Sequence, residues 1–240
     1  MSLNHKTFPQ VVRVQTKWKI KAYSQALVPL LILQIIMAFL TSSGSGTSSL
    51  TINQVTVESY FYSVDVFLIS TCIWAVITAF LIQTRGYRQT DLSAITNRAT
   101  GNTANIISLI FFSFIAVIVN YMSLYILVAS IQLIKGIDIF PNSELFNFMQ
   151  FLVAFFIILL AASSGYFISS LFNLSKILGS LFVLVGGFLC IRVLDEQLLT
   201  IVKFYFEAGY FLFLVKALIT AALLFALPVV FLNGKEEVRE

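Results

Sequence analysis

The chain has 240 residues, of which 59% are apolar and only 11% charged, and its mean hydropathy is +0.94. So few charged side chains cannot cover a soluble domain of this size, which excludes a soluble globular protein. The net charge of +4 comes from Lys and Arg gathered in particular segments, so we expect a membrane-orientation signal and no nucleic-acid partner. The composition predicts an all-α integral membrane protein, one transmembrane domain over residues 1–240 embedded in the lipid bilayer.

Residues 1–22 hold five Lys or Arg and no acid. Thr7 and Pro9 suit a helix start, and polar side chains then recur at helical spacing at positions 10, 13, 17 and 21. This pattern predicts an N-terminal interfacial helix, with its basic face toward anionic headgroups and Trp18 at interfacial depth. A signal peptide is the alternative, because an apolar run and small residues follow, but the length and patterning of the basic segment favour retention.

Six apolar stretches predict six transmembrane helices. The connection at 41–60 has no Lys or Arg, whereas the connection at 83–103 has three Arg against one Asp. Because basic short loops stay in the cytoplasm, the first connection is expected outside, the second inside and both termini cytoplasmic, in the cell membrane of a bacterium. The predicted spans are 24–41, 61–82, 105–134, 145–173, 177–194 and 210–232.

The polar connection at 83–103 contains a predicted short cytoplasmic helix. Asp91 can cap it, Leu92 and Ile95 share one face, and Gly101 can end it. Two interpretations stay open: a solvated linker, or a docking element for a soluble partner. On the second interpretation the candidate contact residues are Arg88, Asp91, Leu92, Ile95 and Arg98.

Two polar residues within the spans are candidates for a translocation path or a subunit interface. Asp65 lies about one turn inside the outer end of the second span, where it either snorkels to the headgroups or faces a pore. Asn120 lies at the middle of the third span, where an amide must find a partner, so we expect it to face another helix or subunit. The small residues at 161–165 should allow close helix approach.

The segment before the last span is amphipathic, with polar side chains three to four residues apart. It is too short and too charged to cross, so it should lie on the outer leaflet or dip in and return, as a re-entrant or interfacial helix. Lys216 follows within the last span and should pair with Glu207, Asp65 or a partner subunit, or snorkel outward. The candidate external gate comprises Glu196, Thr200, Lys203, Glu207 and Lys216.

The sequence offers no catalytic chemistry of its own. His5 is the single histidine and lies near the N-terminus, and Cys72 and Cys190 fall in apolar runs without metal-ligand spacing. No nucleotide-binding P-loop pattern occurs. We therefore expect a chain that is not an enzyme, binds no metal or cofactor, and depends on another polypeptide for any energised work.

The order of these segments resembles the membrane subunit of a type-2 ATP-binding-cassette exporter, or ABC permease. The resemblance implies a connecting helix at Phe8–Lys21, a coupling helix at about 91–100 and an outer closing segment at 196–207. It also implies a second membrane subunit, either another copy or a homologue, and P-loop ATPase subunits that bind ATP and Mg²⁺. The expected function is ATP-driven export of an apolar or amphipathic peptide, lipid or drug.

Two other functions remain open: an ion-coupled carrier, and a non-transport membrane protein such as an immunity or assembly factor. A carrier should show ionisable groups at the membrane midplane, and this chain offers Asp65 and Lys216, both near the outer end. An immunity protein would need no ATPase partner.

Overall fold

A computed structural model describes residues 7–42, 46–52, 55–61, 63–84, 98–135, 147–192, 197–207 and 209–233. These residues are helical apart from one two-stranded hairpin. The elements in chain order are α1 (Phe8–Tyr23), a 3-10 turn (Ser24–Ala26), α2 (Leu27–Leu40), β1 (Gly46–Ile52), β2 (Val55–Phe61), α3 (Asp65–Ile82), α5 (Arg98–Lys135), α6 (Phe148–Leu174), α7 (Lys176–Arg192), α8 (Gln197–Phe206) and α9 (Tyr210–Asn233).

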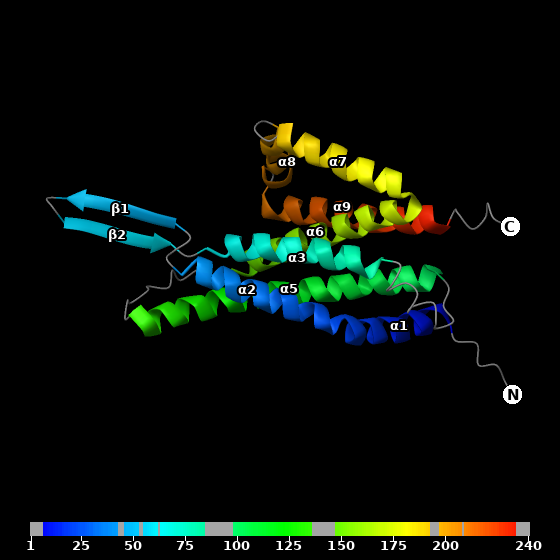
Figure 1. Ribbon diagram of the computed structural model, residues 1–240, viewed down its shortest axis with the longest axis horizontal. Helices are drawn as coiled ribbons and strands as arrows, with labels where there is room; N and C mark the ends of the chain where they lie inside the picture. Colours follow the sequence, from blue (N-terminus) through cyan, green and yellow to red (C-terminus); the bar gives the residue numbers. More distant parts are fainter. Residues whose placement is uncertain are drawn as a thin grey trace.

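The long helices lie side by side along one axis, and α2, α3, α5, α6, α7 and α9 run in alternating directions (Figure 1). As a result α1 begins and α9 ends at the same end of the bundle. The end of α3 and the start of α5, which flank residues 85–97, also lie at this end, which we call the terminal end. The β-hairpin and α8 lie at the opposite end, the hairpin end.

Five helical stretches of the described chain are long and apolar enough to cross a membrane, where the sequence predicted six. The stretch that falls short is α7, whose 17 residues span roughly 25 Å at 1.5 Å per residue, against a hydrocarbon core of ~30 Å. The coarser prediction, a helical protein of multi-pass membrane character, agrees with these lengths and compositions. The candidate spans are Phe8–Leu40, Asp65–Ile82, Ala99–Leu133, Phe148–Leu174 and Tyr210–Val230.

The external connection predicted at 41–60 is not purely a loop. β1 and β2 pair antiparallel from Gly46↔Phe61 to Ile52↔Val55, so Phe61 belongs to a strand and α3 begins at Asp65. The physical reason is the run of β-branched Thr, Ile and Val residues on both sides of Asn53 and Gln54, since such residues favour extended backbone. The hairpin projects past the helix ends (Figure 1).

Two further boundaries differ from the predictions. α5 begins at Arg98, so Gly101 lies inside this helix and the prediction that it ends a cytoplasmic helix is wrong. A glycine inside a helix costs about 1 kcal/mol, a small loss once α5 is nucleated and packed along its apolar length. At the N-terminus α1 runs into α2 through a single 3-10 turn and contributes to a 33-residue crossing stretch, so a separate interfacial helix stays a prediction.

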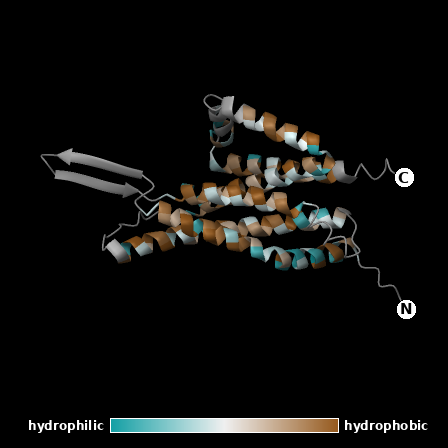
Figure 2. Cartoon of the chain, viewed as in Figure 1, coloured by the Kyte–Doolittle hydropathy of each residue, from teal (hydrophilic) through white to brown (hydrophobic). Residues whose placement is uncertain are grey.

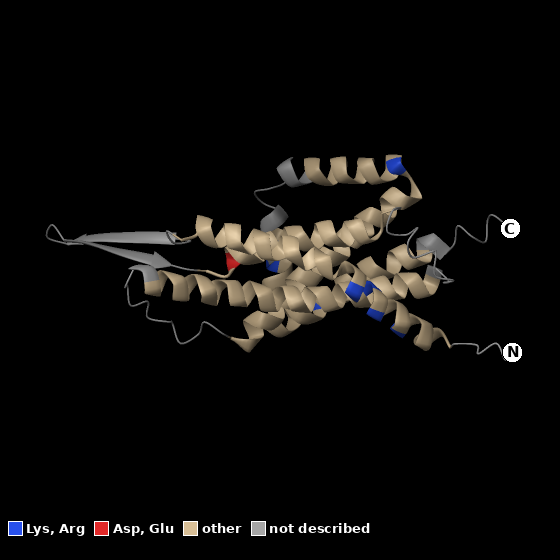
Figure 3. Ribbon diagram, turned by 60° about the horizontal axis from the view of Figure 1, so that its bottom comes forward, with Lys and Arg blue, Asp and Glu red and all other residues tan. Residues whose placement is uncertain are grey.

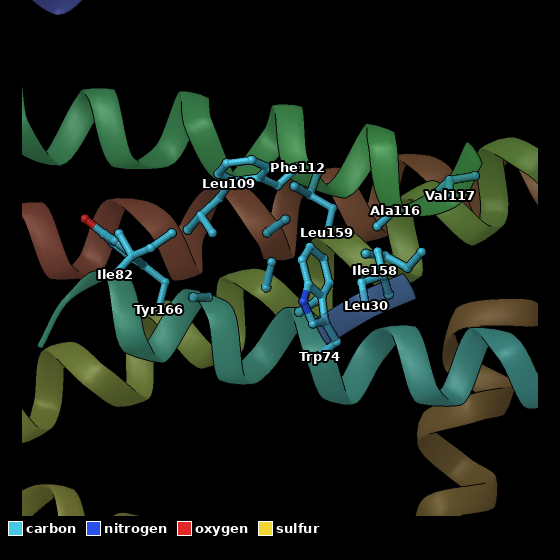
Figure 4. Packing of buried hydrophobic residues seen from close by; sticks show 14 of the residues in the cluster. Leu30, Trp74, Ile82, Leu109, Phe112, Ala116, Val117, Ile158, Leu159 and Tyr166 are labelled. Carbon is cyan, nitrogen blue, oxygen red and sulfur yellow. The ribbon is translucent and has the colours of Figure 1, made fainter. Parts of the chain in front are cut away.

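The core lies between α2, α3, α5, α6 and α9, and its side chains interdigitate from all of these helices (Figure 4). The closest approach joins α3 and α6. A Cβ added to Gly165 would stand 2.4 Å from the Val76 carbonyl oxygen, a separation that no side chain tolerates. The absence of a side chain at Gly165 therefore sets how closely α3 and α6 pack.

Candidate functional site

The roots of the 85–97 segment are buried and tied to other helices at the terminal end. At the end of α3, Gln83 is 2% exposed, and its carbonyl accepts a 3.0 Å hydrogen bond from Asn173 Nδ2 near the end of α6. One turn earlier, the Ser169 hydroxyl of α6 donates to the Phe80 carbonyl at 2.9 Å. The end of α3 therefore moves with the end of α6.

The start of α5 is tied to α1 in the same way. Lys19 is 2% exposed, and its ammonium donates to the Gly101 carbonyl at 3.3 Å and to Asn105 Oδ1. Burying an ammonium costs desolvation free energy unless hydrogen bonds replace its water. The two acceptors therefore offset the cost of burying Lys19. Lys19 belongs to a stripe on α1, with Val12, Thr16 and Tyr23, that is buried while the neighbouring basic side chains stay exposed.

A cleft of about 610 Å³ opens beside the tie between α3 and α6. It lies between the end of α3, the end of α6 and the start of α7, and polar side chains supply much of its wall. Its lining includes Phe80, Thr84, Ser169, Asn173, Lys176 and Ser180. The terminal end thus combines a hydrogen-bonded platform with a concave surface next to the 85–97 segment.

Of the predicted coupling residues, the structure describes one. Arg88, Asp91, Leu92 and Ile95 lie outside the described residues, while Arg98 is the first residue of α5. Lys and Arg gather on α1 at this same end (Figure 3), and hydrophilic residues concentrate on α1 and the first turns of α5 (Figure 2). The polar surface of the described helices is therefore concentrated where the 85–97 segment emerges.

A layer of buried polar side chains crosses the middle of the bundle. Gln34 of α2 is 2% exposed, and its Nε2 donates to Thr71 Oγ1 at 2.7 Å and to the Phe67 carbonyl at 3.4 Å. Its Oε1 has no hydrogen-bond partner in the described part of the chain. Ser70, next to Thr71 on α3, is fully buried as well.

Asn120 of α5 falls at the level of this layer. About one helical turn from the polar layer toward the terminal end, an apolar cluster includes Leu30, Trp74 and Val117. About one turn toward the hairpin end, a second cluster includes Met37, Phe67 and Leu124. Asn120 lies between Val117 and Leu124, as Gln34 does between Leu30 and Met37. Asn120 is completely buried, and neither atom of its amide has a hydrogen-bond partner among the described residues.

At the hairpin end, α8 is fastened to α9. Lys216 places its ammonium 4.1 Å from the centroid of the Phe204 ring and donates a hydrogen bond to the Phe204 carbonyl. The Tyr205 hydroxyl donates to Thr220 Oγ1 at 3.1 Å, and Phe206 stacks on Phe213 at 4.7 Å. Gly209, with φ +85°, supplies the left-handed backbone of the turn between the two helices.

The external gate formed by the other candidate residues and Lys216 stays a prediction. Thr200, Lys203 and Glu207 are exposed on or just after α8, and Glu196 lies outside the described residues. Asp65 is exposed at the first position of α3, where a carboxylate suits the helix dipole, and its Oδ2 accepts a 2.5 Å hydrogen bond from the Ser63 hydroxyl. In the structure Lys216 is bound by the backbone and ring of α8.

Three residues of this arrangement escaped the sequence analysis: Lys19, Gln34 and Asn173. Each had a signal. Lys19 stands on a 12–16–19–23 stripe, away from the basic face, and Gln34 is an amide within an apolar run, as Asn120 is. Asn173 had only its place at the end of a span.

No cluster of His, Cys, Asp or Glu able to hold a metal occurs in the described part of the chain. No protein-family model, curated protein or solved structure matches this sequence or fold.

Proposed function

We propose that the protein is the membrane-spanning subunit of an ATP-driven exporter of the ABC class, driven by separate P-loop ATPase subunits through the 85–97 segment. The observation that carries this proposal is the pair of buried ties at the roots of that segment. Asn173 holds the α3 root to α6, and Lys19 holds the α5 root to α1. A solvated linker would need no such fastening.

The ties give the segment mechanical leverage. Displacing an unattached loop spends the applied work on local bending, whereas displacing two hydrogen-bonded helix ends moves the helices themselves. Here a push on residues 85–97 would reach α3 and α5 directly and α6 and α1 through the ties. The cleft of about 610 Å³ beside Asn173 gives a partner a concave surface to enter.

The remaining parts fit an export path. The buried polar layer of Gln34, Ser70, Thr71 and Asn120 is uncharged, which suits an apolar or amphipathic substrate such as a peptide, a lipid or a drug. α8, fastened to α9 at the hairpin end, would cover the outer mouth of such a path. A second membrane subunit, another copy or a homologue, would complete the path, and ATP and Mg²⁺ would bind on the ATPase. Both termini would be cytoplasmic in this orientation, which agrees with the basic α1 at the terminal end.

The first experiment tests for the motor. The tagged chain is expressed with its gene neighbours, and we expect a P-loop ATPase to copurify and its ATP hydrolysis to depend on the membrane chain. The double variant Leu92→Asp with Ile95→Asp should abolish copurification while the chain still inserts. The matched control is Ile137→Asp with Ile139→Asp, which places the same charges between α5 and α6 at the other end. Failure of any ATPase to copurify would refute the proposal.

The second experiment tests the ties. Asn173→Ala removes the donor to the Gln83 carbonyl, so the ATPase should still bind but its hydrolysis should lose its dependence on the membrane chain. The matched control is Asn147→Ala, on the same helix, where Asn147 Oδ1 caps α6 by accepting from the Met149 amide at 2.9 Å. Equal effects of the two variants would show that the Asn173 tie transmits nothing.

A further inference from the structure

A second concave surface lies between α1 and α5. It is a groove of about 590 Å³, within the usual range for ligand sites. Its wall is apolar except for Arg13, Lys17 and Thr16. The apolar lining residues are Phe8, Pro9, Val12, Ile20 and Ile107.

The groove lies at the boundary between headgroups and hydrocarbon. α5 is mostly polar from Arg98 to Asn105 and mostly apolar from Ile106 onward, so we place its entry into the hydrocarbon near Ile107. Arg13 and Lys17 are exposed on the face of α1 that borders the groove. An apolar trough that reaches into the hydrocarbon therefore carries two cations at its rim.

One buried polar group inside the groove lacks a partner. Thr16 is 9% exposed, and its hydroxyl oxygen has no hydrogen-bond partner among the residues that the structure describes. A buried hydroxyl left in this way costs free energy that a bound acceptor would recover. The Thr16 oxygen lies beneath the groove surface, so its side chain would have to shift before a phosphate or ester oxygen held between Arg13 and Lys17 could accept from it.

We propose that this groove binds one anionic phospholipid, with its phosphate at Arg13 and Lys17 and an acyl chain along Val12, Ile20 and Ile107. Charge decides the occupant: two cations at a membrane boundary attract an anionic headgroup, whereas a second copy of this basic helix would be repelled. The bound lipid bridges α1 and α5 on the side next to the Lys19 tie. It therefore holds α1 against the helix that leads out of the 85–97 segment. The site does not depend on the proposed transport function.

The test measures lipid binding to the purified full chain in detergent by native mass spectrometry. The probes are dioleoyl phosphatidylglycerol, dioleoyl phosphatidylcholine and glycerophosphoglycerol, the headgroup without acyl chains. We expect phosphatidylglycerol to bind and the other two to bind at least about tenfold more weakly. The double variant Arg13→Gln with Lys17→Gln should weaken phosphatidylglycerol binding by about tenfold or more.

The matched control is Lys21→Gln, which removes a charge from an exposed position of the same helix that does not line the groove. It should change binding by less than about twofold. Ile107→Trp fills the trough without altering charge and should weaken binding of phosphatidylglycerol. Size-exclusion chromatography checks that each variant is folded.

Four results would overturn the proposal. Loss of binding in Lys21→Gln equal to that in the double variant would indicate diffuse attraction without a site. Equal binding of phosphatidylcholine would show that the rim charges do not select the ligand, and equal binding of glycerophosphoglycerol would show that the trough holds no acyl chain. A change of oligomeric state in Ile107→Trp with unchanged lipid retention would assign the groove to a second copy.

Discussion

α6 and α7 are neighbours in the chain, yet their glycines serve opposite purposes. Gly165 of α6 lies against α3, where an added Cβ would stand 2.4 Å from a backbone oxygen. Gly186 and Gly187 of α7 have no atom within 4 Å of an added Cβ. The first glycine sets a helix crossing, while the other two contact no helix among the described residues.

The surroundings of the two helices differ in the same sense. Ile158, Ala162 and Tyr166 of α6 are buried, whereas α7 exposes large apolar side chains around most of its surface, with Leu184 73% and Phe188 61% exposed. α7 meets α6 near its start, where Gly179 faces Phe172 and the Phe182 ring meets Phe167 at 5.8 Å. The bundle therefore has a tightly crossed interior and a peripheral helix whose surface is open to lipid or to another subunit.

Gly165→Ala should cause the largest loss of stability. The added methyl meets the Val76 backbone, which cannot rotate away, so α3 and α6 must separate. We expect a loss of about 2–3 kcal/mol in unfolding free energy, the upper range for overpacking. The measurement is reversible unfolding in detergent micelles. An unchanged unfolding midpoint would mean that the crossing is looser than described.

Asn120→Leu tests whether the buried amide of Asn120 lowers the stability of the tightly packed interior. It replaces a buried amide without partners by an apolar side chain, which should stabilise the fold by about 1–2 kcal/mol. Asn173→Leu, which removes a hydrogen bond that is made, should destabilise it. If Asn120→Leu is instead destabilising, its amide has partners that the described residues do not supply, such as a second subunit.

Gly179→Ala should give an intermediate effect. An added Cβ would lie 2.5 Å from the Phe172 ring, but that side chain can rotate whereas a backbone cannot. We expect a loss of about 1 kcal/mol, accompanied by a change in the contact between the Phe172 and Phe80 rings. Disulfide crosslinking between cysteines placed on α6 and α7 would report any displacement of α7.

Gly186→Ala should have the smallest effect and the opposite sign. With nothing within 4 Å, the added methyl costs no contact and reduces the backbone entropy lost on helix formation. We expect a gain of about 0.5–1 kcal/mol in the same unfolding assay. A loss of stability at this position would indicate that α7 is covered by a partner in the assayed state.

The sequence predicted helices at each apolar stretch because hydropathy and length are local quantities. It could not predict how far each helix extends. Gly101, for example, is typical of a loop, and the hydrogen bond that its carbonyl accepts from Lys19 of α1 is a tertiary contact. The external hairpin was missed because its Ser and Gly content outweighed the alternation of β-branched residues. The partners of polar residues, such as Asn173 with Gln83, depend on which helices meet, and a single sequence does not contain that information.

The 3-10 turn between α1 and α2 has a mechanical consequence of its own. A turn of this kind leaves carbonyl groups outside the regular helical ladder, and the Ala26 carbonyl accepts a 2.8 Å hydrogen bond from Trp74 Nε1. Trp74 lies on α3, the helix that ends at the root of the 85–97 segment. α3 therefore contacts the turn between α1 and α2 through Trp74, near its middle, and leads into the 85–97 segment at its end.

Such a linkage works in both directions. Suppose that a partner bound at residues 85–97 shifts the equilibrium toward one angle between α1 and α2. Fixing α1 and α2 at that angle then raises the affinity for the partner by the same factor, because both effects share one coupling free energy. A bound lipid or an engineered crosslink that fixes α1 would therefore change partner binding at residues 85–97 allosterically, without contacting that segment.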